Sequence, residues 1–127
     1  MNKDNIDYTE EQINQVWAKG FVVEGYDPRL YRRDAASAWM YRKAYGDRES
    51  GLGWEIDHIY PKSKGGDETL INLRPMNWHN NVSKGDDFPV YTADVISEKS
   101  SNIYKPTTCL VAQSIQNELK KLYSNDK

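Results

Sequence analysis

WEIDHIYPKSKGG, residues Trp54–Gly66, is the stretch that decides how we expect the protein to fold. Apolar and polar residues alternate through Trp54, Ile56 and His58, which is the period-two pattern of a strand with one buried face. A proline and a double glycine follow at once, and the conformational freedom of glycine lets a chain turn tightly. The stretch therefore predicts a strand that runs into a loop. It places an acid and a histidine side by side, Asp57-His58, near the end of that strand.

The residues after this stretch complete a strand–loop–strand–helix plan. LINL, at 70–73, is a second apolar run of strand length, so we expect it to be the returning strand of a hairpin. PMNWHNNVSK, at 75–84, begins with a proline, which suits the first turn of a short helix. The sequence thus predicts a hairpin followed directly by a helix.

The remaining segments show mostly helical patterns. A capping-box pattern and an apolar stripe predict a helix over about 10–19. An N-cap followed by proline predicts a second helix that starts at Asp27 and ends at Gly46 or just after it. Residues 87–107 contain prolines and a polar run, so we expect irregular structure with a short extended piece. Apolar residues spaced by three and four predict an amphipathic helix over about 108–123.

These patterns predict an α+β protein that is mostly helical and forms a single domain over 1–127. Its parts would be an N-terminal helical part (1–50), a hairpin-helix core (53–86), and an irregular segment followed by the C-terminal helix (87–127). A protein of 127 residues is large enough for one modest core, and four Trp and nine Tyr would fill much of it.

Composition excludes several classes of protein. Cys109 is the one cysteine, so an internal disulfide is excluded, and with two histidines the sequence contains too few Cys and His for a closed four-ligand zinc site. No apolar run reaches the roughly 18 residues of a membrane span, and the polar N-terminus is unlike a signal peptide. We therefore expect a cytoplasmic protein that does not contact a membrane.

The charge is unevenly distributed along the sequence. The net charge of −2 is not typical of a nucleic-acid binder, but residues 29–48 contain six basic side chains against two acidic ones. The basic ones are Arg29, Arg32, Arg33, Arg42, Lys43 and Arg48. Two interpretations stay open: a solvated helix face, or a surface that follows a phosphate backbone.

Asp57 and His58 have complementary chemistry. Adjacent strand residues point to opposite faces, so the two side chains would approach one phosphate group from two directions. A carboxylate is a hard ligand for Mg²⁺ or Mn²⁺, and a neutral imidazole is a base near working pH. On its own such a pair is more often structural. Polar residues further on, Asn72 on the returning strand and Asn81 on the short helix, favour metal-assisted phosphodiester hydrolysis.

The residues over Glu55–Asp86, EIDHIYPKSKGGDETLINLRPMNWHNNVSKGD, resemble the HNH endonuclease motif. The shared pattern is D-H-I-x-P, G-G, N-L and N-x-x-K. The resemblance implies the ββα-metal fold, in which a hairpin and a helix hold one metal ion. The nine-residue step from Asn72 to Asn81 is similar to the HNH domain of CRISPR effector nucleases. The lead-in over 38–59 resembles bacterial and phage HNH proteins that lack zinc-binding cysteines.

The resemblance implies a role for each of four residues. His58 would be the general base, and Asp57 a metal ligand. Asn72 would accept a hydrogen bond from the His58 imidazole and fix its orientation. Asn81 would be the second metal ligand, which makes the motif one of the H-N-N type. An amide oxygen at that position favours a hard ion, so we expect one Mg²⁺ or Mn²⁺.

Neighbouring side chains offer alternatives to Asn81. His79 lies two residues away on the helix, so the two side chains would point in nearly opposite directions and would not share a metal. Asn77 shares the helix face of Asn81 but misses the N-x-x-K spacing. Asn77 and Asn80 stay open as alternative ligands.

Basic side chains around the motif are candidates for phosphate contacts: Lys62, Lys64, Arg74 and Lys84. Each also has a structural interpretation. Lys62 and Lys64 are loop lysines that solvent would cover, Arg74 could form a surface ion pair, and Lys84 could stabilise the end of its helix through the dipole. Trp54 and Trp78 are expected to pack in the core, with base stacking as the alternative.

Together these features predict a metal-dependent endonuclease that cleaves DNA, of bacterial or phage type. No helix or finger that reads bases is evident, so we expect low sequence specificity. RNA is an alternative substrate. Two other hypotheses stay open: an antibacterial toxin or defence nuclease with an immunity protein, and a non-catalytic HNH-like scaffold that binds nucleic acid or protein. The C-terminal helix could also pair with a second copy in a homodimer.

Overall fold

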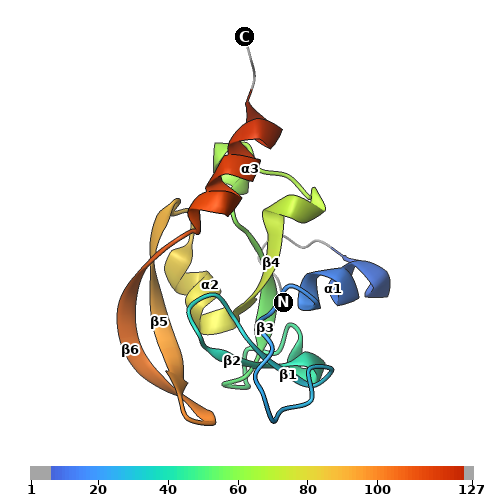
Figure 1. The fold of residues 1–127 in the computed structure, drawn as a ribbon, viewed down its shortest axis with the longest axis vertical. Coiled ribbons are helices and arrows are strands. Elements are labelled where there is room, and N and C mark those ends of the chain that lie inside the picture. Colours follow the sequence, from blue (N-terminus) through green and yellow to red (C-terminus); the bar gives the residue numbers. More distant parts are fainter. Residues whose placement is uncertain (1–6, 125–127) are drawn as a thin grey trace.

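Three two-stranded antiparallel sheets and three α-helices make up residues 7–124, the part of the protein that this computed structural model describes (Figure 1). The elements are α1 (Glu10–Trp17), β1 (Tyr31–Arg33), β2 (Trp39–Tyr41), β3 (Trp54–His58), β4 (Leu73–Asn77), α2 (Trp78–Lys84), β5 (Val90–Glu98), β6 (Ser101–Leu110) and α3 (Gln113–Tyr123). Three short 3-10 helices lie between them: η1 (Arg42–Ala44), η2 (Lys62–Lys64) and η3 (Leu70–Asn72).

The β3–β4 hairpin and α2 form the centre of the molecule. β3 pairs antiparallel with β4, from Trp54 opposite Asn77 to His58 opposite Leu73, and every residue of both strands is buried. α2 follows β4 without a linker, because the Asn77 side chain caps the helix by accepting from the His79 amide. The predicted strand–loop–strand–helix plan is confirmed, but the returning strand begins at Leu73 rather than at residue 70, so Asn72 lies in η3. The helix begins at Trp78 rather than at Pro75, which is part of β4.

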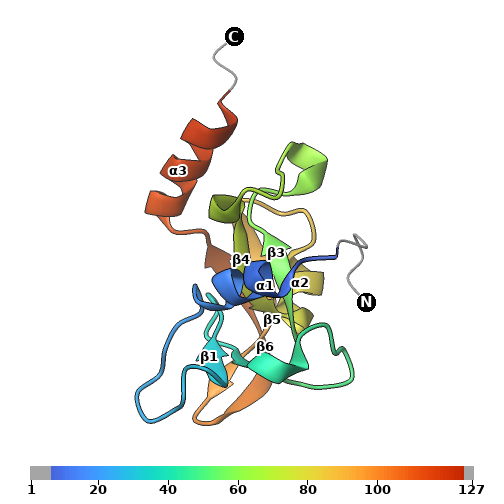
Figure 2. The ribbon, with the colours of Figure 1, turned by 90° about the vertical axis from the view of Figure 1, so that its right-hand side faces the viewer.

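Both faces of this central hairpin are covered. α1 lies across one face, where Val16 and Trp17 pack against Trp54 and Ile56, and α2 with β5 covers the other (Figure 2). A second apolar cluster joins Met76 of β4 to Tyr91 of β5 and to α3. The hairpin is therefore enclosed by segments that precede it and segments that follow it in the sequence.

The predicted first helix is confirmed, but the second is wrong. α1 begins with a capping box, in which Thr9 and Gln12 bond each other's backbone amides. The segment after Asp27 forms the β1–β2 hairpin and η1 instead of a helix. Its aromatic residues pair across the strands, with the Tyr31 and Tyr41 rings stacked 5.1 Å apart, a contact that favours a hairpin.

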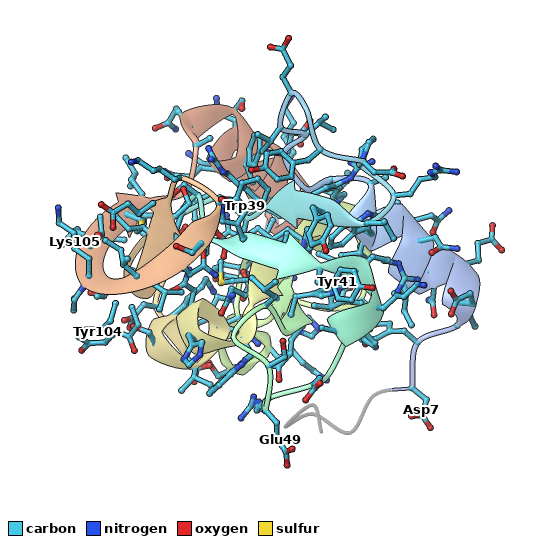
Figure 3. All side chains as sticks on the ribbon, turned by 90° about the horizontal axis from the view of Figure 1, so that it is seen from below. Asp7, Trp39, Tyr41, Glu49, Tyr104 and Lys105 are labelled. Atoms are coloured by element: carbon cyan, nitrogen blue, oxygen red, sulfur yellow. The ribbon has the colours of Figure 1, made fainter. Side chains whose placement is uncertain are left out.

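Residues 87–107, which we expected to be irregular, contain β5 and most of β6. Tyr91, Ala93 and Val95 of β5 are buried, and a bulge between Ala93 and Val95 shifts the pairing register. Figure 3 shows Tyr104 and Lys105 of β6 pointing outward, and Trp39 of β2 close to this hairpin. The C-terminal helix is confirmed, but it begins at Gln113 because the preceding residues belong to β6.

The α+β class is confirmed, and the expectation of a mostly helical protein is wrong. About as many residues lie in strands (31%) as in helices (30%). The extra strands come from the two hairpins that the sequence patterns did not predict. The division of the protein into three parts within one domain stays a prediction.

One buried carboxylate, that of Asp34, ties three of these elements together. Its Oδ1 accepts from the amides of Ala36 (2.9 Å) and Ala38 (2.8 Å) in the β1–β2 turn. Its Oδ2 accepts from the Asn77 amide (3.0 Å) and from Asn80 Nδ2 (3.1 Å), at the end of β4 and on α2. Burial raises the pKa of the Asp34 carboxyl, and these four donors oppose that rise.

Replacing Asp34 by Asn should destabilise the protein by about 3 kcal/mol or more, because an NH₂ group would then face two buried donors. Urea unfolding measures the change. The matched control is Asp87→Asn, at an exposed position, which should stay within about 0.5 kcal/mol of the wild type. Equal stabilities for the two variants would contradict the conclusion that Asp34 holds the β1–β2 turn, β4 and α2 together.

Candidate active site

Asp57 and His58 lie at the end of β3 and point to opposite sides of the hairpin. Asp57 faces α2, where it meets Lys84, and His58 faces the loop between β3 and β4, where it meets Glu68. The expected separation of the two side chains is therefore observed. It divides the site into a carboxylate side and an imidazole side.

On the carboxylate side, Asp57 is held between two cations. Its Oδ2 accepts from Arg74 Nε at 3.0 Å, and its Oδ1 lies 3.3 Å from Lys84 Nζ. The side chains of Asp57, Arg74 and Lys84 are 3%, 8% and 0% exposed. Burial lowers the pKa of Lys84, with Asp57 opposing. Burial also acts to lower the pKa of Arg74, but the charge and hydrogen bond of Asp57, together with Tyr91 and Asp34, raise it. One carboxylate thus neutralises one of two buried positive charges.

The burial of Lys84 and Arg74 beside Asp57 does not support the predicted phosphate contacts of these two side chains. Lys84 Nζ also donates to the His58 carbonyl at 3.2 Å, and the Arg74 guanidinium lies over the Tyr91 ring at 5.2 Å. Both side chains are directed into the protein. Their observed role is to hold β3, β4 and α2 together around Asp57.

Asn81 meets a second carboxylate that the sequence analysis did not single out. Its Nδ2 donates to Glu55 Oε1 at 2.9 Å, and Arg48 binds the same carboxylate through Nε and Nη2 at 2.5 and 2.9 Å. Glu55 is two residues before Asp57, so strand alternation puts both acids on the face toward α2. That spacing was the sequence signal for Glu55.

The other asparagines and the second histidine have structural contacts. Asn77 Nδ2 donates to the Trp39 and Gly51 carbonyls, and Asn80 bonds Asp34 and the backbone of Val95. The His79 ring stacks on Trp78 at 3.7 Å, and burial lowers its pKa. These contacts give Asn77, His79 and Asn80 structural roles, so Asn81 stays the predicted metal ligand on α2.

Asn72 anchors the loop backbone instead of the imidazole. Its Oδ1 accepts from the Tyr60 amide at 2.7 Å, and its Nδ2 donates to the carbonyls of Tyr60 and Asp67, each at 3.1 Å. The side chain is fully buried. A Cβ at Gly66 would lie 1.8 Å from the Tyr60 carbonyl oxygen, so only glycine fits where the loop crosses the strand. We expected Asn72 to orient the His58 ring. In the structure its side chain instead holds the loop backbone at Tyr60 and Asp67.

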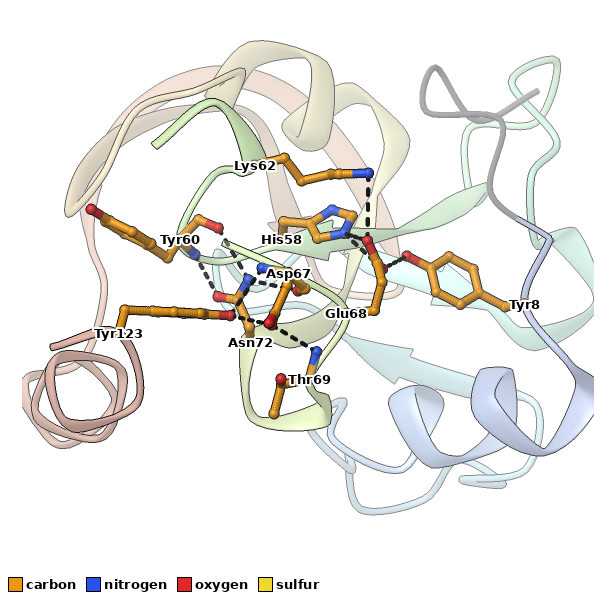
Figure 4. Close-up of polar contacts among 9 residues, drawn as sticks. All are labelled: Tyr8, His58, Tyr60, Lys62, Asp67, Glu68, Thr69, Asn72 and Tyr123. Atoms are coloured by element: carbon orange, nitrogen blue, oxygen red, sulfur yellow. Dashed lines mark hydrogen bonds and ion pairs between the residues drawn. The ribbon is translucent and has the colours of Figure 1, made fainter. Parts of the chain in front are cut away.

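On the imidazole side, His58 meets Glu68. His58 Nε2 lies 2.9 Å from both carboxylate oxygens of Glu68 (Figure 4). The Tyr8 hydroxyl donates to Glu68 Oε1 at 2.6 Å, and Lys62 Nζ is 3.6 Å from Oε2. Burial acts to raise the pKa of Glu68, but the bonds from Tyr8 and His58 outweigh it and lower the pKa. Glu68 is thus an ionised acceptor at neutral pH.

Of the four predicted phosphate contacts, the two loop lysines reach the surface. Lys62 is half-exposed and pairs with Glu68, and Lys64 is exposed in η2. The basic stretch over 29–48 has mostly internal partners. Arg32 donates to three backbone carbonyls, and Arg42 bonds Glu10 and Asn14. The stretch is therefore not a helix face, and of its basic side chains Arg29 and Lys43 are exposed.

Comparison with known families agrees with this geometry. Residues 50–90 match the family model described as HNH endonuclease. This segment is therefore similar to HNH endonucleases. No curated protein and no solved structure matches the sequence. The HNH segment contains the whole strand–loop–strand–helix unit and both sides of the site. None of the helices in residues 7–124 is long and apolar enough to cross a membrane.

HNH nucleases generally use a divalent metal ion, so the predicted ligands Asp57 and Asn81 can be tested for fit. Both oxygens of Asp57 face cations, and a divalent ion beside Lys84 and Arg74 would be repelled by both. Within residues 7–124, no group of three or more His, Cys, Asp and Glu side chains could hold a metal ion. In this arrangement the residues do not fit a divalent ion between Asp57 and Asn81.

Asp57→Ala should destabilise the protein by about 3–5 kcal/mol, because it leaves two buried cations without their carboxylate. The double variant Asp57→Ala/Lys84→Met should recover part of this loss, since one of the two charges is gone. Urea unfolding of both variants measures the coupling. Lys62→Ala, which breaks a half-exposed pair, is the control and should cost at most about 1 kcal/mol. A loss below about 1 kcal/mol for Asp57→Ala would contradict a stabilising role for the buried ion triad of Asp57, Arg74 and Lys84.

Proposed function

We propose that this protein hydrolyses phosphodiester bonds of nucleic acid, with His58 as the general base. The observation that carries the proposal is the His58 ring held by an ionised Glu68 at the end of β3, within the segment that matches the HNH endonucleases. An imidazole of this kind can take a proton from water near neutral pH.

The contact with Glu68 determines which nitrogen of His58 acts. An ionised carboxylate only accepts hydrogen bonds, so in the neutral ring Nε2 carries the proton and the lone pair is on Nδ1. Nδ1 is then the atom that accepts a proton from water. The water oxygen forms a bond to phosphorus as the bond to the leaving ester oxygen breaks, and that oxygen takes its proton from solvent.

DNA is the substrate we propose, cleaved with low sequence specificity. Lys62 and Lys64 support contact with a phosphate backbone, because the loop that holds Glu68 exposes both side chains and Lys62 lies 3.6 Å from Glu68 Oε2. Bacterial or phage origin and cytoplasmic location are parts of the same proposal, and any Mg²⁺ or Mn²⁺ that assists cleavage would bind outside the space between Asp57 and Asn81. No step is assigned to an ion, because both oxygens of Asp57 already face cations.

One observation favours a second candidate function. The triad around Asp57 fills the carboxylate side of the site with internal ion pairs. A non-catalytic HNH-like scaffold, which binds nucleic acid or protein without cutting, would keep that triad and have no need for a base. Cleavage decides between the two, because only the enzyme depends on His58.

Wild-type protein should nick supercoiled plasmid in the presence of Mg²⁺ or Mn²⁺, and His58→Ala should reduce the rate by at least about 100-fold, as for loss of a general base. Agarose-gel analysis of nicked and linear plasmid over time measures the rate. The matched control is His79→Ala, which removes the other histidine and should cut nearly as fast as wild type. Wild-type protein that binds plasmid but never cuts it would support the scaffold instead.

A further inference from the structure

We infer that Glu68 is the positioning residue for His58, an inference that rests on the proposed function. Both oxygens of Glu68 lie 2.9 Å from His58 Nε2, so the carboxylate straddles the ring nitrogen. An imidazole alone has two neutral tautomers and can turn over about its Cβ–Cγ bond. A fixed carboxylate at Nε2 selects one tautomer and one ring orientation.

Glu68 is itself held in place from several directions (Figure 4). Tyr8, in the segment before α1, donates to Oε1 at 2.6 Å, and Lys62 lies 3.6 Å from Oε2. The neighbouring residue, Asp67, is fixed by Tyr123 of α3, whose hydroxyl donates to Asp67 Oδ1 at 2.7 Å and accepts from the Asp67 amide at 3.0 Å. The acceptor for His58 is thus built by residues far apart in the sequence, from Tyr8 to Tyr123.

The inference also accounts for Asn72. Its three backbone bonds fix Tyr60 and Asp67, one residue before Glu68. Asn72 therefore acts on His58 through the loop, by setting where Glu68 stands. The competing explanation is a half-exposed ion pair that only stabilises the loop, since the Glu68 side chain is 38% exposed. The two explanations differ in what happens to the His58 ring when the carboxylate is removed.

Nitrogen-detected imidazole NMR reads the ring directly and needs no activity. Spectra at about pH 8.5, where an ordinary imidazole is neutral, give the tautomer of each histidine. The His58 signals are those that disappear in His58→Ala. In wild type we expect His58 to be mainly the Nε2–H tautomer, and in Glu68→Ala we expect a mixture. Glu68→Gln, which can still accept through its amide oxygen, should lie between them.

Glu24→Ala is the matched control, because it removes a glutamate carboxylate at an exposed position outside the site. It should leave the tautomer unchanged. In the nicking assay, Glu68→Ala should lower kcat by about 10- to 100-fold with little change in KM, as for loss of an orienting partner. Glu24→Ala should leave both near their wild-type values.

An Nδ1–H tautomer in wild type, or the same tautomer in wild type and Glu68→Ala, would overturn the inference. So would a kcat of Glu68→Ala equal to that of Glu24→Ala. If Glu68→Ala does not fold, the wild-type tautomer and the Glu68→Gln spectrum still decide. If the protein cuts nothing, the proposed function fails, while the NMR result continues to test whether Glu68 sets the His58 ring.

Discussion

The pairing of Asp57 with Arg74 and Lys84 is the constraint on which the site depends. It joins a carboxylate of β3 to a guanidinium of β4 and an ammonium of α2, all buried. Because strand side chains alternate, fixing Asp57 toward α2 sends His58 to the other face. A shift of the β3–β4 register by one residue would move Asp57 to the opposite face of the hairpin. The buried cations Arg74 and Lys84 would then lose their carboxylate. The ion triad thus determines the position of the imidazole.

The HNH segment does not complete its own site. Residues 50–90 supply His58 and Glu68, but the contacts that hold Glu68 include Tyr8, and the adjoining Asp67 depends on Tyr123. The start of α2 is likewise fixed by Asp34 of the β1–β2 turn, which accepts from the Asn77 amide. A short hairpin and a seven-residue helix cannot enclose a core alone. The flanking segments therefore provide both the burial and the last contacts of the site.

Local signals predicted the parts of the fold that local bonds determine. The capping box at Thr9 and the alternation of β3 both act within a few residues, and both appear as expected. The β1–β2 hairpin was missed because Asp27-Pro28 looks like a helix start, whereas Asp27 binds Arg29 and the turn is set by Asp34, bonded to residues over 40 positions away. The β5–β6 hairpin was missed because the prolines and the polar run in 87–107 look irregular, and because β6 has no buried residue and therefore no apolar alternation.

The residues of the candidate site were predicted better than their partners. A motif fixes spacing, so Asp57, His58, Asn72 and Asn81 fall close to the expected elements, yet each meets a partner that spacing does not specify. Asp57 is the clearest case, because one carboxylate here holds three elements together. Loss of activity after its removal would follow from loss of structure as readily as from loss of a ligand. The imidazole side can be separated from stability more easily, since the Glu68 side chain is 38% exposed and the tautomer of His58 reports on the ring itself.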